Sequence, residues 1–311
     1  MTNPAAIALA GTALLLAIHS GPSPRAVEQG LLKLGHALPH ASGGGKNGRG
    51  KGGGGGKGGG GPALINLKGM VENRVIGPLN VVGPYRIVES SKDVVLRNLR
   101  IQGVTGTDLQ RDGIRIRGDA VGVTIQNFRL AMRNQQQVSP NLPTGIAISS
   151  GQAITISDGE VSGFQMVKVP GKYTNGDGIA SERAVHDLTI ARVVSKDNSD
   201  GGFDLKSNPT KLDQLRSENN GRNYRLWSEV EAGTLTSIDP RGAHIWAAKT
   251  AMVHIKRLIA QSSTQAPLVE IEGAGQVIID SCELHLPPGT RLVEKSNEGR
   301  VSLGRGCSVP R

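Results

Sequence analysis

Two short strand-like units alternate along most of this chain, and this repetition constrains its fold more than any other feature. The first unit has the texture of VVLRNLRI (94–101) and VTIQNFRL (123–130), and it recurs at intervals of roughly 23 to 41 residues. The second unit, such as DGIRIRG (112–118), precedes several copies of the first. The units are separated by neither a convincing long helix nor a two-residue hairpin turn, which favours parallel strands in successive coils. We therefore predict an all-β fold, a right-handed parallel β-helix of roughly seven or eight coils.

Alternation within the second unit assigns each residue to the core or to the solvent. A narrow core filled by aliphatic residues fits a chain with two Trp, three Tyr and three Phe. The residues predicted to point inward are Ile114, Ile116, Ile146, Ile148, Ile179, Phe203, Leu205, Tyr224, Leu226, Ala243 and Ile245. Those predicted to point outward on one sheet are Arg115, Arg117, Ala147, Ser149, Ala180, Glu182, Asp204, Lys206, Arg225, Trp227, His244 and Trp246. We also expect Asn198 and Asn220, one coil apart, to stack as an asparagine ladder in a turn.

The first 61 residues differ in composition from the repeats. Residues 1–21 contain the 14-residue apolar run AAIALAGTALLLAI, which is too short for a comfortable membrane span and is typical of a secretory signal. An uncleaved anchor is the alternative. Residues 22–61 end in GGGKNGRGKGGGGGKGGGG, which we interpret as a disordered linker because nothing in it can be buried. We expect a β-helix domain over 62–311, in a secreted or periplasmic protein that contacts a membrane only if its N-terminal segment is uncleaved.

The formal net charge of +10 favours a polyanionic partner. No nucleic-acid-binding module is recognisable, and the basic residues do not alternate with aromatic residues on one helix, so we do not expect DNA or RNA to be that partner. Cys282 and Cys307 are separated by about one repeat. They can pair between neighbouring coils in an exported protein, or remain as two buried thiols.

Three acidic residues are predicted to converge at one end of the outward column. Asp177 in NGDG and Asp200 in KDNSDGG enter successive strands, and Asp204 follows on the second of these strands. Adjacent coils are about 4.8 Å apart, so these carboxylates repel one another unless a cation compensates. A hard ion such as Ca²⁺ would suit an oxygen-rich site. The alternative is a charge-balanced surface on which Lys206 and Arg225 pair with the acids.

Three motifs resemble, in order and at similar spacing, the calcium-site motifs of β-helical pectate lyases, and most closely those of polysaccharide lyase family 9. They are NGDGIA (175–180), NSDGGFDL (198–205) and NYRLWS (223–228). The resemblance implies Ca²⁺ as cofactor with Asp177, Asp200 and Asp204 as ligands, and an acidic, uronate-containing polysaccharide as partner. It places Arg225 at the position of the family's catalytic Lys. Two departures are evident, because Gly201 replaces one of the family's paired acids and Arg225 replaces the Lys.

β-Elimination removes the proton next to a sugar carboxylate, so it needs a cation to neutralise the developing enolate and a base to take the proton. An Arg side chain is essentially always protonated, which makes Lys206 and His244 rival candidates for the base. We expect Arg115, Arg117 and His244 to contact carboxylates of the substrate. The leading hypothesis is a calcium-assisted lyase with Arg225 or Lys206 as the base.

Two other functions are open on the same scaffold. A glycoside hydrolase would use a pair of the same acidic residues on opposite sides of the scissile bond. A non-catalytic β-helix that binds polysaccharide or builds a surface structure would tolerate both departures from the lyase motifs, since a fold does not fix a function. In each case we expect a monomer.

Overall fold

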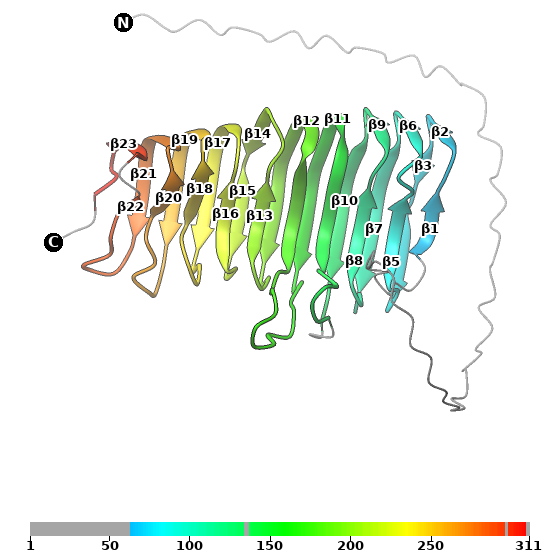
Figure 1. Cartoon of the computed structure of the whole chain (residues 1–311), viewed down its shortest axis with the longest axis horizontal. Coiled ribbons are helices and arrows are strands. Elements are labelled where there is room, and N and C mark those ends of the chain that lie inside the picture. Colours follow the sequence, from blue (N-terminus) through cyan, green and yellow to red (C-terminus); the bar gives the residue numbers. More distant parts are fainter. Residues whose placement is uncertain (1–62, 134–136, 296–297, 309–311) are drawn as a thin grey trace, which may run out of the picture. The chain divides into compact units, whose positions relative to one another are not determined.

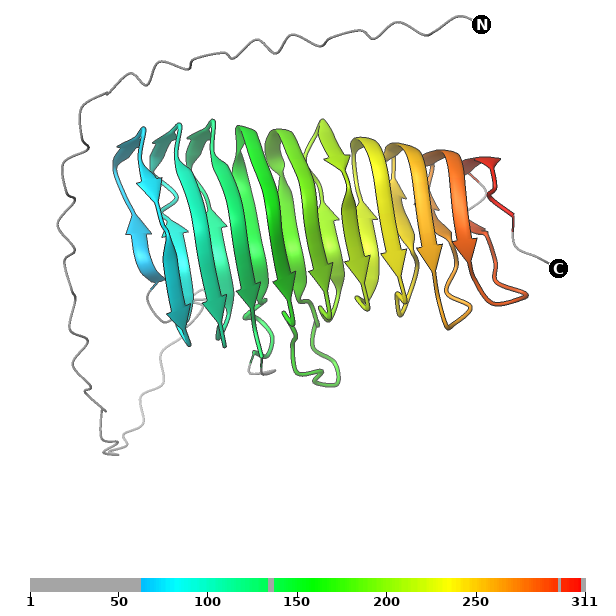
Figure 2. The same cartoon turned by 180° about the vertical axis from the view of Figure 1, so that it is seen from behind.

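The structure is a computed structural model that describes residues 63–133, 137–295 and 298–308 of the chain. The predicted signal segment and Gly-rich linker lie outside the described residues. The described part consists of 23 strands in parallel coils, seen from both sides in Figures 1 and 2. Within those ranges, no helix is long and apolar enough to cross a membrane.

Each coil has three faces, and strands of successive coils stack in parallel on each face. Face 1 contains β1 (Ala63–Leu67), β5 (Arg86–Ser90), β8 (Asp112–Ile116), β13 (Gly201–Leu205), β16 (Arg222–Leu226), β18 (Ile245–Lys249), β20 (Val269–Gly273) and β22 (Val293–Lys295). Face 2 contains β2 (Met70–Glu72), β6 (Val95–Arg97), β9 (Asp119–Val121) and β14 (Thr210–Asp213). Face 3 contains β3 (Val75–Ile76), β4 (Leu79–Val82), β7 (Arg100–Thr107), β10 (Thr124–Ala131) and β15 (Leu215–Glu218).

The remaining strands belong to more than one face or end the stack. β11 (Thr144–Ser162) and β12 (Asp177–Lys196) run through all three faces, since each pairs with strands of every face. β17 (Glu229–Ile238), β19 (Met252–Gln261) and β21 (Gln276–His285) run from face 2 to face 3, and β23 (Arg300–Arg305) pairs with β21.

The predicted fold class, an all-β parallel β-helix, is confirmed, but the predicted number of coils is wrong. The solenoid has about 10 turns. The additional turns lie at the two ends, where β2, β3 and β22 are short and do not repeat the two sequence units. A terminal coil has a neighbour on one side only, so its side chains are less constrained. Met70 and Val82, for example, are 73% and 72% exposed.

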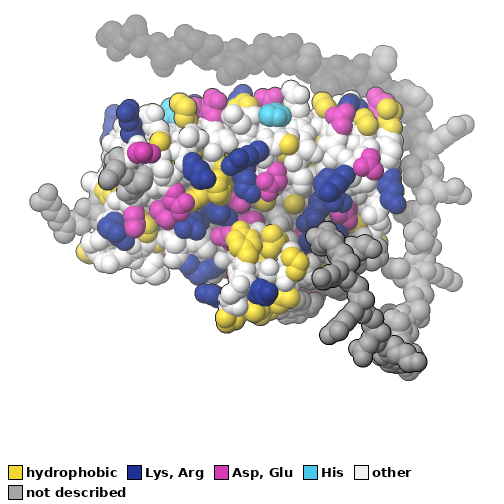
Figure 3. Space-filling view, in the orientation of Figure 1, with side chains coloured by type: hydrophobic (Ala, Val, Ile, Leu, Met, Phe, Trp, Pro, Cys, Tyr) yellow, Lys and Arg dark blue, Asp and Glu magenta, His cyan; other side chains and the backbone are white. Residues whose placement is uncertain are grey.

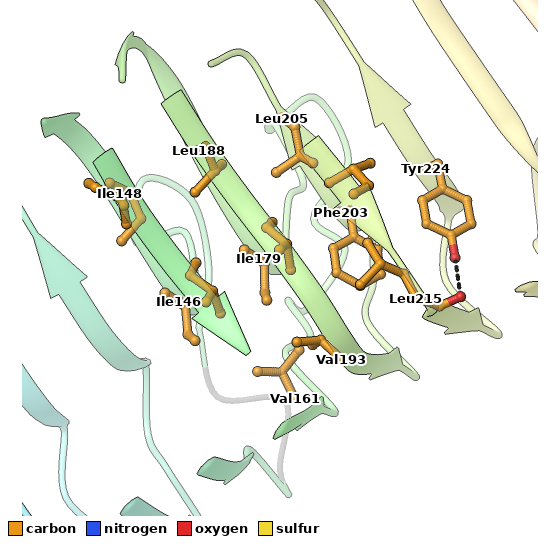
Figure 4. Packing of buried hydrophobic residues seen from close by; sticks show 14 of the residues in the cluster. Ile146, Ile148, Val161, Ile179, Leu188, Val193, Phe203, Leu205, Leu215 and Tyr224 are labelled. Atoms are coloured by element: carbon orange, nitrogen blue, oxygen red, sulfur yellow. Dashed lines mark hydrogen bonds between the residues drawn. The ribbon is translucent and has the colours of Figure 1, made fainter. Parts of the chain in front are cut away.

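Apolar side chains from successive coils stack in register inside the solenoid. Ile114, Ile146, Ile179, Phe203 and Tyr224 follow one another across β8, β11, β12, β13 and β16 and are fully buried. The rings of Phe203 and Tyr224 stack with centroids 5.4 Å apart, and the hydroxyl of Tyr224 donates a hydrogen bond to a backbone oxygen (Figure 4). All the residues predicted to point inward are buried, but Ala243 packs with Trp246 and Ala248 instead of in the main core. Each large side chain buried in this way stabilises the fold by about 1.5–3 kcal/mol.

A ladder of buried polar side chains lines the turn between face 3 and face 1. The side-chain and backbone N–H groups of Asn198 donate to Oδ1 of Asn220 at 2.8 and 2.9 Å. Nδ2 of Asn220 in turn donates to Oγ of Ser217 and Oδ1 of Asn223, each at 3.0 Å. All four residues are fully buried. The predicted stacking of Asn198 on Asn220 is therefore confirmed, and it satisfies polar groups that would otherwise be left unpaired in the core.

Cys282 and Cys307 form a disulfide, which decides between the alternatives left open by the sequence. Cys282 lies on β21 and Cys307 follows β23, the strand that pairs with β21. The bond therefore ties the end of the last coil to the coil before it.

Replacing Asn220 by Ala tests the polar ladder. The variant leaves the N–H groups of Asn198 without their acceptor in the core, so we expect the free energy of unfolding to fall by about 2–4 kcal/mol. Asn80→Ala, at an exposed position of β4, is the matched control and should change stability by less than about 0.5 kcal/mol. Urea unfolding followed by circular dichroism measures both, and equal effects would contradict the role of the ladder.

Candidate active site

A cleft opens on the outward side of face 1, above two small residues. The register places Arg115, Ala147, Ala180 and Asp204 in one outward column across β8, β11, β12 and β13. Because the alanines have no side chain beyond Cβ, the column is hollow between the Arg and the Asp. The cleft has a volume of about 220 Å³. Figure 3 views the molecule in the orientation of Figure 1 and shows groups of Lys, Arg, Asp and Glu side chains on this side of the molecule.

The loop between β11 and β12 supplies one wall of the cleft and extends beyond the ends of these strands (Figure 1). Its Tyr173 is 60% exposed, and the Tyr173 hydroxyl donates to Oδ1 of Asn175 at 3.3 Å. Leu142, from the preceding loop, also lines the cleft. The sequence prediction missed all three residues because loop positions carry no strand periodicity. The only available signal was the NGDG motif that follows Tyr173 and contains Asn175.

Asp177 is the first residue of β12, and its carboxyl group lies buried in the cleft wall. The backbone N–H of Gly201 donates to Oδ1 at 2.8 Å, and Nδ2 of Asn175 donates to Oδ2 at 2.7 Å. Burial, together with the negative charges of Asp204 and Asp200, raises the pKa of Asp177 to about 8. At neutral pH this side chain is therefore mainly a neutral carboxylic acid.

Asp204 is a second buried carboxyl in the same wall, and it has charged partners. Nε1 of Trp227 donates to Oδ1 at 2.5 Å, while Nη1 of Arg225 and Nζ of Lys206 lie 3.4 and 3.9 Å from Oδ2. Burial raises the pKa of Asp204, and these three groups oppose the rise. Two neighbouring buried carboxyls titrate as a pair. The cations beside Asp204 favour the negative charge there and the proton on Asp177.

The guanidinium group of Arg225 lies between two of the acids. Its Nη1 donates to Oδ2 of Asp200 at 2.7 Å and to Oδ2 of Asp204 at 3.4 Å. It also lies 5.6 and 5.4 Å from the ring centroids of Trp227 and Trp246. Burial alone would lower the pKa of Arg225, but the acids outweigh it and the net pKa is raised. The pairing of Arg225 and Lys206 with the acids, the alternative foreseen from the sequence, is therefore found for Asp200 and Asp204 and not for Asp177.

Lys206 also holds its proton. Its Nζ donates to Oε1 of Glu182 at 3.0 Å. Burial works against the ammonium charge, but Asp204 and Glu182 more than compensate, so the pKa of Lys206 is raised. Neither Lys206 nor Arg225 is thus free to take a proton at neutral pH.

Gly201 is the residue that lets these groups crowd together. A Cβ at this position would lie 2.9 Å from Oδ1 of Asp177 and 3.3 Å from both Cδ of Arg225 and Cβ of Asp204. An acid here, as in the lyase motif, would have to displace these neighbours. Gly201 thus leaves room for Oδ1 of Asp177 and for the side chains of Arg225 and Asp204.

The three acids predicted to bind calcium lie together, but their oxygens already accept bonds from protein donors. Calcium takes six to eight oxygen ligands, whereas the guanidinium of Arg225 fills the space between Asp200 and Asp204. Among the residues that the structure describes, no group of three His, Cys, Asp or Glu side chains is placed to hold a metal ion. The residues in this arrangement do not fit Ca²⁺, and calcium binding stays a prediction.

The outward position predicted for His244 is wrong. This residue is fully buried in the turn before β18, with its Nδ1 2.8 Å from Oγ of Ser237, and burial lowers its pKa to about 4. Its place beside Arg225 is taken by Trp246, two residues further on. The pairing of β18 with β16 is thus shifted by two residues from the predicted register. Such a shift keeps Ile245 pointing inward, so the alternation of inward and outward residues could not reveal the error. His244 is not available to a ligand in the cleft.

Arg115 and Arg117, both predicted to contact substrate, take different positions. Arg115 lines the cleft. Arg117 is turned toward β5, where its Nη2 pairs with Oε1 of Glu89 at 2.6 Å and its Nε donates to the backbone oxygen of Ser90 at 3.0 Å. The structure thus places Arg115, Asp177, Asp204 and Lys206 in the cleft. Arg225 joins Asp200 to Asp204 beside it, and His244 is excluded.

Comparisons with known proteins place the chain in no family. No family model and no curated protein matches it. Among solved structures, a polygalacturonase from Erwinia carotovora ssp. carotovora aligns with a TM-score of 0.39 and 12% identity over 70% of this chain and 57% of that one. The Dettilon tailspike protein (gp208) aligns with a TM-score of 0.34 and 11% identity over 76% of this chain and 61% of that one. The alignments thus cover less than two thirds of either structure.

Asp177→Asn tests the raised pKa through stability. The folded state holds the proton up to about pH 8, whereas an ordinary Asp loses it near 3.8. The contribution of this group to stability is therefore full below about pH 4 and is lost as the pH rises to about 8. We expect the stability of the variant to fall less steeply over this window, by up to about 1.4 kcal/mol per pH unit.

Denaturant unfolding at several pH values measures the effect. Asp213→Asn, which removes an exposed carboxyl of β14, is the control and should keep the wild-type slope. The same slope in wild type and Asp177→Asn would show that Asp177 is ionised in the folded protein at neutral pH.

Proposed function

We propose that this protein hydrolyses glycosidic bonds of an acidic polysaccharide in the cleft of face 1, with Asp177 as the general acid and Asp204 as its carboxylate partner. The observation that carries the proposal is the pair of buried carboxyls in the wall of an open cleft. Among the described residues, the ion pairs in this wall involve Asp204 and not Asp177. The cations of the wall therefore stabilise the charged form of Asp204 more directly than that of Asp177.

Such a pair suits the cleavage of a glycosidic bond. One protonated carboxyl donates its proton to the leaving oxygen, and one ionised carboxylate activates water or stabilises the positive charge that develops on the sugar. Asp177 can donate a proton at neutral pH because burial keeps it protonated. Arg225 and Lys206 keep the charge on Asp204 in place, and their own positive charges do not have to be removed for the reaction.

An acidic polymer suits the walls of this cleft. Arg115 stands at one end and Lys206 at the other, and the exposed ring of Tyr173 offers an apolar surface for a sugar. The net charge of +10 favours the approach of a polyanion. A secreted or periplasmic location and a monomeric state stay predictions from the sequence.

Calcium-assisted β-elimination, the hypothesis drawn from the lyase resemblance, would use the same cleft with different chemistry. It requires an unprotonated base, yet Arg225 and Lys206 are both charged and engaged in ion pairs. It also requires a cation on the substrate carboxylate, and the acids here are already bonded to protein groups. We therefore place hydrolysis ahead of elimination.

A non-catalytic polysaccharide binder is the second candidate. Arg225 fills the space between Asp200 and Asp204 and packs against two Trp rings, an arrangement that stabilises face 1 without any reaction. A protein of this kind would bind the same acidic polymers and leave their length unchanged.

Incubation of the purified protein with polygalacturonate separates these functions. We expect new reducing ends without the ultraviolet absorbance of unsaturated uronates, and no effect of EDTA. The rate should fall as the pH rises past about 8, where Asp177 loses its proton. Asp177→Asn and Asp204→Asn should each lower the rate at least about 100-fold, and Asp213→Asn should not.

Other outcomes would identify the alternatives. Unsaturated products whose formation requires calcium would contradict hydrolysis and support the lyase. Binding of several acidic polymers without a change in their length would support the non-catalytic binder.

A further inference from the structure

Four arginine side chains gather around two carboxylates at the N-terminal end of the cleft. The arginines are Arg86, Arg111, Arg115 and Arg117, and the carboxylates are Glu89 and Asp112. Most of these residues lie on the adjacent strands β5 and β8, with Arg111 and Arg117 flanking β8. We call this group the arginine cluster. Its member Arg115 lines the cleft together with Asp177 and Asp204, but the proposed proton transfer uses none of the six residues.

Asp112 is the fully buried centre of the cluster. Its Oδ2 lies 2.5 Å from Nε of Arg86, 3.0 Å from Nη2 of Arg115 and 3.7 Å from Nε of Arg111. Its Oδ1 accepts a hydrogen bond from the backbone N–H of Thr144 at 3.2 Å. One carboxylate therefore faces three guanidinium groups.

Glu89 compensates only part of the remaining charge. It pairs with Nη1 of Arg86 at 2.8 Å and with Nη2 of Arg117 at 2.6 Å. Within the described residues, the ion pairs of the four arginines reach no other acid, so positive charge is in excess. Burying unbalanced charge is costly, and the cluster is therefore suited to an anion from outside the chain.

Arg115 is the member of the cluster that reaches the cleft. Its side chain is 20% exposed and lines the cleft wall, whereas those of Arg86 and Arg111 are 7% and 10% exposed. Nε of Arg115 and Nε of Arg111 are buried, and the structure gives them no hydrogen-bond partner. Burial and the neighbouring Arg86 and Arg111 lower the pKa of Arg115. An anion on Arg115 would relieve this repulsion.

The register fixes where such an anion would sit relative to the proposed acid. Asp112, Thr144 and Asp177 are paired across β8, β11 and β12, so Asp112 lies two coils from Asp177, about 10 Å. Arg115 occupies the matching outward column, and Ala147 and Ala180 leave the path from it toward Asp204 open. A polymer lying along the solenoid axis can touch both ends of the cleft.

We propose that the arginine cluster is an anion subsite in which Arg115 binds the carboxylate or sulfate of a sugar unit about two coils N-terminal of Asp177. The inference rests on the proposed function, because it assumes that the same polymer occupies the cleft. Substrate choice would then depend on an anionic group of the polymer that is remote from the scissile bond. Guanidinium groups suit this role because they bind carboxylates and sulfates through paired hydrogen bonds.

Isothermal titration calorimetry tests the subsite without relying on catalysis. Wild type is titrated with an oligogalacturonate, its uncharged methyl ester, and a sulfated oligosaccharide of the same length. We expect tighter binding of at least one charged ligand than of the ester, and the tighter charged ligand identifies the group. Arg115→Gln should weaken that binding about 10- to 100-fold and leave ester binding unchanged.

Two further variants keep the test decisive. Arg115→Lys retains the charge but loses the paired geometry, and should recover part of the affinity. Arg257→Gln removes an exposed arginine of β19 that pairs with Glu283, and should bind like wild type. The subsite is contradicted if the ester binds as tightly as the charged ligands, if none of the ligands binds, or if Arg115→Gln binds like wild type. Failure of the proposed hydrolysis would instead appear as intact, Arg115-dependent binding without cleavage.

Discussion

Each coil is hydrogen-bonded in register to the next, so residues far apart in the sequence stand in columns about 4.8 Å apart. Inside the solenoid the columns are apolar, as in Ile114, Ile146 and Ile179. Outside, the same register sets Arg115 and Asp204 in line with two alanines between them. The cleft is thus a direct consequence of small side chains at two positions of one column.

Close stacking also forces charged groups together, and the protein compensates for this in two ways. Around Asp112 it provides an excess of guanidinium groups. Around Asp177 it provides fewer cations than acids, because Arg225 and Lys206 are shared with Asp204 and other carboxylates. The result is a cleft with a positive end and an end that retains a proton. This asymmetry supports the proposal of a bound anionic sugar chain with an acid at one of its linkages.

The sequence predicted the interior of this fold well, because alternation within a strand reveals which side a residue faces. It also predicted the pairing of Asn198 with Asn220, and the convergence of the acids. It failed for His244, since the register after a turn depends on the length and packing of that turn. It could not decide whether an ion or Arg225 lies between the acids, because that depends on side-chain reach and on the space beside Gly201. Tyr173 lies on a loop without periodicity.

The protonation of Asp177 at neutral pH is the central claim, and nuclear magnetic resonance can measure it directly. The side-chain carboxyl carbon of Asp177 can be assigned by its absence from the spectrum of Asp177→Asn and then followed as the pH is raised. We expect a titration midpoint near 8. A midpoint near the ordinary value of 3.8 would mean that Asp177 is ionised at neutral pH, and would contradict its role as the general acid.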